Sequence, residues 1–165
     1  MRALVCAASA AALSACTVSI PVEVTATQGA LPASSVIELA SFPIDESLRG
    51  QFGSALEAAF ASHNVRLSSD GAVIAEFAVA ERSATSGTAD PTASTEENIV
   101  WSSEPRESHW WDQCEARRLR GTLVLLNRVD GSLLYRGTAE AIDCDFGADH
   151  LNAMAQALVQ DSQAR

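Results

Sequence analysis

Two apolar runs in residues 120–141 flank the dipeptide Asp130-Gly131 and leave this part of the chain few ways to fold. Asp-Gly is a preferred central pair of the two-residue type I′ turn, whose central residues both need positive φ. The pattern therefore predicts a β-hairpin in which Val129 lies opposite Ser132. In that register, the side assigned to the core carries Val124, Leu126, Tyr135 and Gly137, and the other side carries Leu123, Leu125, Arg136 and Thr138.

Two further segments repeat apolar residues with the 3.6-residue period of an amphipathic helix. The first covers residues 45–62, where Asp45 can act as the N-cap. The second covers residues 148–160, with Asp145 or Asp149 as the expected N-cap. Each segment predicts a helix that buries one stripe and exposes a polar face.

Short runs rich in apolar residues predict strands at residues 35–42, 65–67 and 72–81. Residues 17–33 mix polar and apolar side chains, and Val18, Ile20, Val22 and Val24 alternate. Part of this segment is therefore either a strand or an extended tether. Together with the hairpin and the helices, these strands predict an α+β fold, a small antiparallel sheet with two helices packed on one face. We expect one folded domain over residues 35–162.

Composition limits the class of protein. A chain of 165 residues with 47 % apolar residues suffices for one domain with a core. Residues 83–98 contain no aliphatic side chain larger than Ala, so we expect a flexible loop there. A net charge of −10 argues against nucleic-acid binding. All 11 basic residues are arginine, which excludes catalysis by a lysine of this chain.

The first 15 residues have the composition of a secretory signal. Arg2 is the only charge before Glu23, and the residues from Ala3 to Ala15 are Ala, Leu, Val, Ser and one Cys. This stretch is shorter than the ~20 apolar residues that span a bilayer. Its removal would take away Arg2 and change the net charge from −10 to −11. From this balance we expect no basic patch that attracts anionic lipid head groups.

The signal ends in Leu13-Ser14-Ala15-Cys16, which resembles the lipobox of bacterial lipoproteins. The resemblance implies that the Cys16 thiol receives a diacylglyceryl group and that cleavage makes Cys16 the first residue of the mature chain. Residues 16–34 would then be the lipidated N-terminus and tether. Thr17 stands where an Asp favours retention in the inner membrane of well-studied bacteria, so the resemblance implies the outer membrane. Several acyl chains anchor a domain stably where one does not.

Four cysteines remain to be assigned. Cys6 leaves with the signal and Cys16 carries the lipid, which leaves Cys114 and Cys144 in an oxidising periplasm that favours a disulfide. In the predicted hairpin register Cys144 lies opposite Arg117. The bridge therefore requires the chain to bend between Cys114 and Arg117, because bridged Cα atoms lie within ~7 Å of each other. The alternative is two free thiols.

All three tryptophans lie close together, at Trp101, Trp110 and Trp111. They could form a recognition edge for sugar rings or for a protein partner, because aromatic side chains are frequent anchors of interfaces. They could equally cover the sheet or pack against the disulfide, and this second interpretation is the simpler one. Adjacent residues of an extended segment point in opposite directions, so only one of Trp110 and Trp111 is easily buried.

Two groups of polar residues could support chemistry only if folding brings their members together. They are His109, Asp112 and Glu115, and the group Asp143, Asp145, Asp149 and His150. Scattered carboxylates with one His are usually a solvated surface, so we expect no metal site and no cofactor. The sequence has no Gly-x-Ser-x-Gly motif and no phosphate-binding glycine loop. We therefore assign no catalytic residues.

The run Arg120-Gly-Thr-Leu-Val-Leu with Leu134-Tyr-Arg-Gly-Thr-Ala-Glu looks like the hairpin of a family of small bacterial envelope lipoproteins. Its members carry one uncharacterised α+β domain after a lipidated Cys, and no catalytic residues are established for them. The resemblance implies a lipid-anchored protein of the outer membrane that faces the periplasm and binds or assembles envelope partners. Two alternatives stay open: a lipid- or glycan-handling auxiliary subunit of a transport or wall-synthesis complex, and a small periplasmic enzyme.

Overall fold

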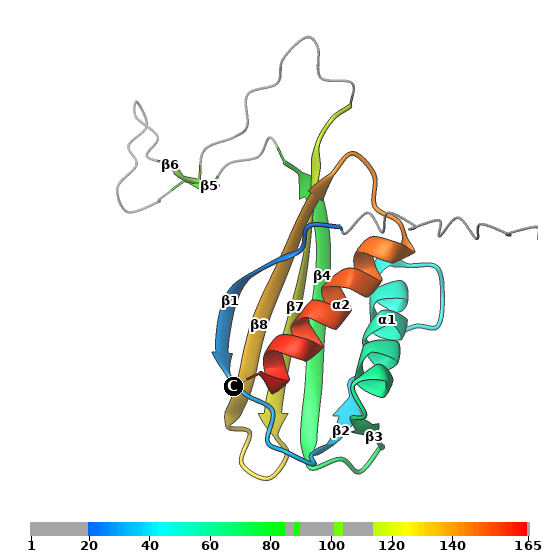
Figure 1. Ribbon diagram of the computed structural model, residues 1–165, viewed down its shortest axis with the longest axis vertical. Helices are drawn as coiled ribbons and strands as arrows, with labels where there is room; N and C mark the ends of the chain where they lie inside the picture. Colours follow the sequence, from blue (N-terminus) through cyan, green and yellow to red (C-terminus); the bar gives the residue numbers. More distant parts are fainter. Residues whose placement is uncertain (1–19, 85–87, 90–100, 104–113, 165) are drawn as a thin grey trace, which may run out of the picture.

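The computed structural model describes residues 20–84, 88–89, 101–103 and 114–164 (Figure 1). A six-stranded sheet in the order β1-β8-β7-β4-β2-β3 carries two helices, and β5 and β6 form a separate two-stranded sheet. In chain order, the elements are β1 (Glu23–Gly29), β2 (Val36–Leu39), α1 (Leu48–Ser62), β3 (Arg66–Leu67), β4 (Val73–Ser83), β5 (Thr88–Ala89), β6 (Trp101–Ser103), β7 (Arg117–Asn127), β8 (Leu133–Asp143) and α2 (Ala148–Gln163).

The fold class is α+β, as predicted, but the sheet is mixed rather than wholly antiparallel. The neighbouring pairs β1–β8, β8–β7 and β7–β4 are antiparallel. In contrast, β2 runs parallel to both β3 and β4. The reason is the connection: α1 carries the chain from the end of β2 back to the start of β3, and such a crossover makes the two strands parallel.

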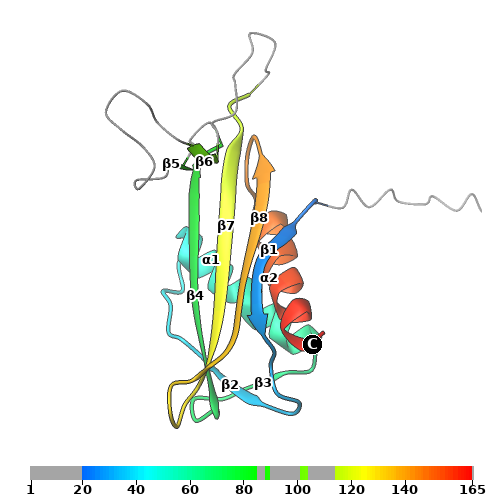
Figure 2. The same ribbon diagram turned by 90° about the vertical axis from the view of Figure 1, so that its left-hand side faces the viewer.

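Both helices lie on the same side of the sheet (Figure 2). The inward residues of the three long strands alternate with outward ones, as the period of a half-buried strand requires. Each helix contributes an apolar stripe with the spacing expected from the sequence. The core that they enclose consists of Ile37, Phe52, Ala55, Leu56, Ala59, Phe60, Val73, Ala75, Phe77, Leu119, Leu123, Leu125, Tyr135, Ala139, Ala141, Leu151, Met154, Ala155, Leu158 and Val159.

The predicted hairpin is present, but its turn and register differ from the prediction. Five residues, 128–132, connect the strands, and Leu125 lies opposite Tyr135. Gly131 adopts a positive φ of 67°, whereas Asp130 does not, so the type I′ turn is not formed. Instead, the Asp130 carboxylate accepts hydrogen bonds from the Ser132 N–H and hydroxyl.

The altered register exchanges the two faces of β7. Leu123 and Leu125 are fully buried, whereas Val124 and Leu126 lie half-buried on the opposite face. A slip of one residue moves every side chain of a strand to the other face, because the side-chain period is two. The predicted core face of β7 is therefore wrong, while Tyr135 of β8 belongs to the core as expected.

The helix caps differ from the predicted ones. Ser47, and not Asp45, is the N-cap of α1, because its hydroxyl accepts a hydrogen bond from the Gly50 N–H at 3.1 Å. Asp45 precedes this N-cap by two residues, and its carboxylate accepts a hydrogen bond from the Ser47 N–H at 3.0 Å. The N-cap of α2 is Gly147, so neither Asp145 nor Asp149 holds that position.

The strand interpretation of the N-terminal segment holds over Glu23–Gly29. This strand, β1, pairs with β8 along its length, so the folded domain begins before residue 35. Most of the predicted loop at residues 83–98 lies outside the described residues. Its residues Thr88–Ala89 form β5, which pairs with β6 further along the chain. Among the described helices, none is long and apolar enough to cross a membrane.

Helix α1 also protects one edge of β4. The Ala40 N–H donates to the Ala75 carbonyl at 2.8 Å, and beyond that point no described strand pairs with β4 on this side. The Arg49 guanidinium instead donates to the Phe77 carbonyl at 2.6 Å. Its central carbon lies 4.4 Å from the centre of the Phe77 ring, which adds a cation–π contact.

Candidate functional site

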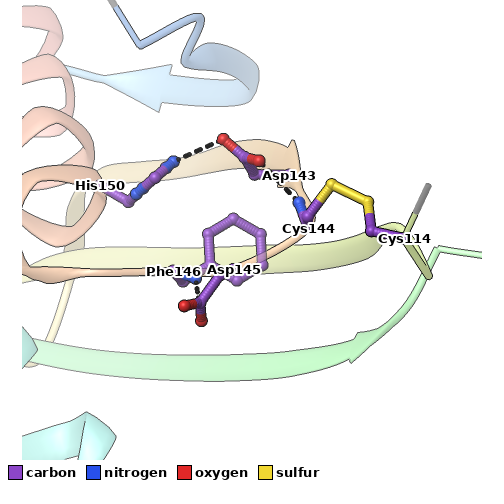
Figure 3. Close-up of a disulfide and its surroundings, with 6 residues drawn as sticks. All are labelled: Cys114, Asp143, Cys144, Asp145, Phe146 and His150. Atoms are coloured by element: carbon purple, nitrogen blue, oxygen red, sulfur yellow. Dashed lines mark hydrogen bonds and ion pairs between the residues drawn. A yellow bond between two sulfur atoms is a disulfide. The ribbon is translucent and has the colours of Figure 1, made fainter.

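A disulfide joins the chain just before β7 to the chain just after β8 (Figure 3). The Cα atoms of Cys114 and Cys144 lie 5.7 Å apart, which confirms the predicted pairing. The chain bends at Cys114, and the strand begins only at Arg117, so the bend that the pairing required is present. The bridge closes one corner at the end of the sheet.

Hydrogen bonds at both ring nitrogens hold the side chain of His150, in α2, at this corner (Figure 3). Its Nδ1 accepts a hydrogen bond from the Gly147 N–H at 3.4 Å, so in the neutral ring the proton is on Nε2. Nε2 lies 3.0 Å from the Asp143 carboxylate and donates to it. The ring also packs edge-on against Phe146 at 5.1 Å. Both ring nitrogens are therefore engaged, which suits a structural clamp and leaves no free nitrogen for a catalytic base.

The ionisation of Asp143 makes the stability of this corner depend on pH. The hydrogen bond from the Cys144 N–H, and then the one from His150, lower the pKa of Asp143 below its usual value of 3.8. A lowered pKa means that the ionised carboxylate stabilises the fold above that usual value. This stabilisation is lost as the pH falls through the pKa of the folded state.

We expect Asp143→Asn to lower the midpoint of thermal unfolding at pH 7, because the amide cannot replace the carboxylate as an acceptor of both bonds. The difference from the parent should shrink as the pH is lowered below 3.8. Melting curves between pH 7 and pH 2 measure both effects. Glu57→Gln, at an exposed position of α1, should melt like the parent at each pH. A difference from the parent as large and as pH-dependent as that of Asp143→Asn would contradict the assignment.

Among the described residues, the other candidate polar side chains do not assemble into a site. Glu115 accepts a hydrogen bond from the Ser83 hydroxyl at 3.2 Å, while His109 and Asp112 lie outside the described residues. Asp145 accepts from the Phe146 N–H, and Asp149 is exposed in the first turn of α2. In the part of the chain that the structure describes, no three His, Cys, Asp or Glu side chains converge as metal ligands would.

The tryptophan cluster cannot be assigned to either of its two interpretations. Trp110 and Trp111 lie outside the described residues, and only the backbone of Trp101 is described, as the first residue of β6. The recognition edge therefore stays a prediction. Cys16, the expected site of lipidation, also lies outside the described residues.

The face of the sheet opposite the helices carries a feature that sequence reasoning missed. At the end of the sheet near the disulfide, Arg82 of β4 lies directly opposite Arg118 of β7, and Arg120 lies on the same face. Glu140 of β8 is within 3.6 Å of Arg118 and 3.4 Å of Arg120. The signal in the sequence was the alternation in Arg118-Leu119-Arg120, which places both arginines on one face of a strand.

A hollow of about 420 Å³ adjoins Arg118, where the chain enters β1. Arg118, Glu140 and Glu23 form its polar side. Its apolar side is formed by Pro21, Val22 and Ile142, of which Ile142 is 50 % exposed. The hollow therefore combines one arginine and two glutamates with an apolar rim.

A second hollow of about 290 Å³ lies between the N-terminal halves of α1 and α2. Leu151 and Ala55 form its floor, and the polar side chains of Asp45, Gln51 and Asn152 surround it. A groove for lipid tails would be expected between the helices and the sheet and would be apolar. This hollow instead lies between the two helices, so it gives little support to lipid transfer.

Comparison with known proteins identifies the fold and nothing finer. No family model matches the chain, and no curated protein matches it. The PelC dodecamer from Paraburkholderia phytofirmans has a TM-score of 0.51 at 12 % identity and covers 88 % of this chain and 98 % of that one. A single-residue variant of that dodecamer gives 0.50 at 12 % identity, with 88 % and 99 % covered.

A PDZ domain protein from Parabacteroides distasonis has a TM-score of 0.50 at 9 % identity. It covers 88 % of this chain, but the chain matches only 36 % of that larger protein. At identities this low, the resemblance concerns the arrangement of strands and helices alone. The chain therefore shares the α+β architecture of these bacterial proteins.

Proposed function

We propose that this protein is a lipid-anchored component of the bacterial envelope, attached to the outer membrane through Cys16, whose domain faces the periplasm and assists assembly without chemistry of its own. The observation that carries the proposal is the Cys114–Cys144 disulfide. Disulfides persist in oxidising compartments and are rare in the cytosol. With the lipobox cysteine acylated and Cys6 removed, this bridge accounts for every thiol of the chain.

Two further observations support an assembly role. Solved structures that share the fold include PelC, which forms a dodecamer. At the corner that the disulfide closes, the one described histidine with a carboxylate partner uses both ring nitrogens for structural contacts. These points favour a binding protein over the enzyme alternative.

The experiment that tests the anchor is labelling of cells with radioactive or alkyne-bearing palmitate. The parent should incorporate label, and Cys16→Ser should lose all of it, because the thiol is the site of acylation. Cys6→Ser removes a neighbouring cysteine of the same signal and should leave labelling unchanged. An unlabelled parent, or equal labelling of Cys16→Ser, would contradict the proposal.

The assembly role has its own test. Native mass spectrometry of the detergent-purified protein should show a species larger than one chain, either alone or with an envelope partner copurified from the same membranes. A strictly monomeric protein without any copurified partner would remove the assembly role while leaving the lipid anchor intact.

A further inference from the structure

The open face of the sheet, in front in Figure 2, carries an apolar patch near the turn between β7 and β8. This hairpin patch is defined as Ile74, Val124, Leu126 and Leu133. Leu126 lies directly opposite Ile74 on one side and Leu133 on the other, and Val124 shares their face because it lies two residues before Leu126. Leu133 is 43 % exposed, and the other three are half-buried. None of the four belongs to the described core or packs against it.

Such a patch is unusual on a sheet face that neither α1 nor α2 covers. Antiparallel sheets with one open face normally alternate apolar residues toward the core with polar residues toward solvent. Contiguous apolar side chains with a polar rim on a protein surface mark a site of interaction. Four aliphatic residues on three adjacent strands therefore indicate that this part of the face binds a partner.

The rim of the hairpin patch carries one charge of each sign. Val124 lies directly opposite Glu76 on β4 and directly opposite Arg136 on β8. Both charged side chains are exposed, and neither forms an ion pair with any residue that the structure describes. Their backbones are two strand spacings apart, which is ~10 Å. The patch thus has an acidic flank and a basic flank, placed symmetrically about Val124.

We propose that a second copy of this chain docks face to face on the hairpin patch, related by a two-fold axis that runs along β7. This rotation places β4 of each copy over β8 of the other. Glu76 of one copy then meets Arg136 of the second copy, and the reverse pair forms on the other flank. Packed sheets lie ~10 Å apart, a gap that a glutamate and an arginine bridge together. The apolar side chains are buried between the two flanks, as in an isologous interface.

The direction of the axis agrees with the proposed anchor at Cys16, and this step rests on the proposed function. Rotation about an axis parallel to the strands leaves both copies pointing the same way. Both chains then enter β1 at the same end of the dimer, so both anchors can reach one bilayer. A two-fold axis across the strands would place the anchors at opposite ends and Glu76 over its own counterpart.

The arginines at the other end of this face limit the size of the contact. Arg82, Arg118 and Arg120 lie on the open face near the disulfide, and the same axis brings them toward their counterparts in the second copy. Like charges repel there, and the twist of each sheet lets the two faces diverge away from the patch. The contact is therefore confined to the hairpin half of the sheet. Because small interfaces are typical of transient complexes, we expect a reversible dimer.

Sedimentation equilibrium of the full, acylated chain in detergent tests the proposal. The parent should show a reversible equilibrium between monomer and dimer. Glu76→Arg or Arg136→Glu alone should raise the dissociation constant about tenfold, because two ion pairs are lost and two repulsive pairs form. The double variant Glu76→Arg with Arg136→Glu restores opposite charges at both flanks and should return the constant to near that of the parent.

The matched controls are Glu57→Arg and Arg66→Glu. They make the same charge changes at exposed positions of α1 and β3, outside the hairpin patch, and should dimerise like the parent. Three results would each overturn the proposal: a parent that is monomeric at every concentration, equal weakening in the controls, or a double variant as weak as the single ones. All four charged positions are exposed, so none of these changes should unfold the chain.

Cross-linking tests the orientation of the two copies. Val124 lies on the proposed axis, so Val124→Cys should be joined to its counterpart by a bis-maleimide that spans ~10 Å, the separation of packed sheets. Ser54→Cys, at an exposed position of α1, should give no more cross-linked product than the parent. A non-reducing gel measures both. Equal yields from the two variants would overturn the face-to-face arrangement.

The outcomes also separate this dimer from the proposed function. A monomeric chain that copurifies with another envelope protein would refute the dimer and leave the assembly role intact. A chain that carries no acyl group would refute the anchor, whereas the charge-swap result in the same chain would still decide the dimer.

Discussion

Cys144→Ser should lower the free energy of unfolding by about 3–4 kcal/mol, because it opens a loop whose ends are 30 residues apart in the sequence. In the chain-entropy model, the bridge acts by restricting the unfolded chain. It also secures the corner at which His150 bonds to Asp143, so the loss should include part of that contact. Urea unfolding followed by circular dichroism measures the change.

The double variant Cys114→Ser with Cys144→Ser is the control for this prediction. Reducing agent should lower the stability of the parent to that of the double variant and should leave the double variant unchanged. A parent that keeps its full stability after reduction would show that the bridge does not contribute.

Gly137→Ala should cost about 3 kcal/mol, more than most substitutions by one methyl group. A Cβ at this position would lie 2.0 Å from the Tyr135 hydroxyl oxygen and 3.0 Å from Leu158 Cδ2. The Tyr135 ring cannot yield, because it is fully buried and its hydroxyl donates to the Leu158 carbonyl at 3.2 Å. The methyl group would therefore displace both the ring and α2. Equilibrium unfolding in urea measures the loss.

Gly147→Ala adds the same methyl group where no atom lies within 4 Å. As the N-cap of α2, this position should lose at most ~1 kcal/mol. Comparable losses in the two variants would show that the close packing of Tyr135 over Gly137 does not determine the cost.

The hairpin shows which features local sequence patterns can predict and which they cannot. The apolar runs predicted both strands correctly, because alternation depends only on the side-chain period. The register depended on a choice between two loop conformations that differ by a few hydrogen bonds. The bonds to Asp130, together with one from the Val129 N–H to the Asn127 side chain, favour the longer loop. Propensity of the Asp-Gly pair alone could not show this.

The site was predictable to a different extent. The disulfide followed from counting cysteines and from the oxidising compartment that the signal predicts, and neither needs coordinates. The contact between Asp143 and His150 depends on where α2 begins, and the position of Gly147 as its N-cap was not foreseen. The pairing of Arg82 with Arg118 was missed because these residues are far apart in the sequence and meet only through strand pairing. The net charge of the whole chain, −10, gave no indication that these arginines cluster on one face of the sheet.

The bond from Arg49 to the Phe77 carbonyl has a consequence for aggregation. A bare strand edge offers carbonyl and N–H groups to any extended peptide, which can add to it and begin a fibril. Here the first carbonyl beyond the last described strand pair is already occupied, and the occupying group is a cation. An incoming strand would have to displace that guanidinium before it could form its first hydrogen bond there. Arg49 thus opposes the addition of a foreign strand at this edge of β4.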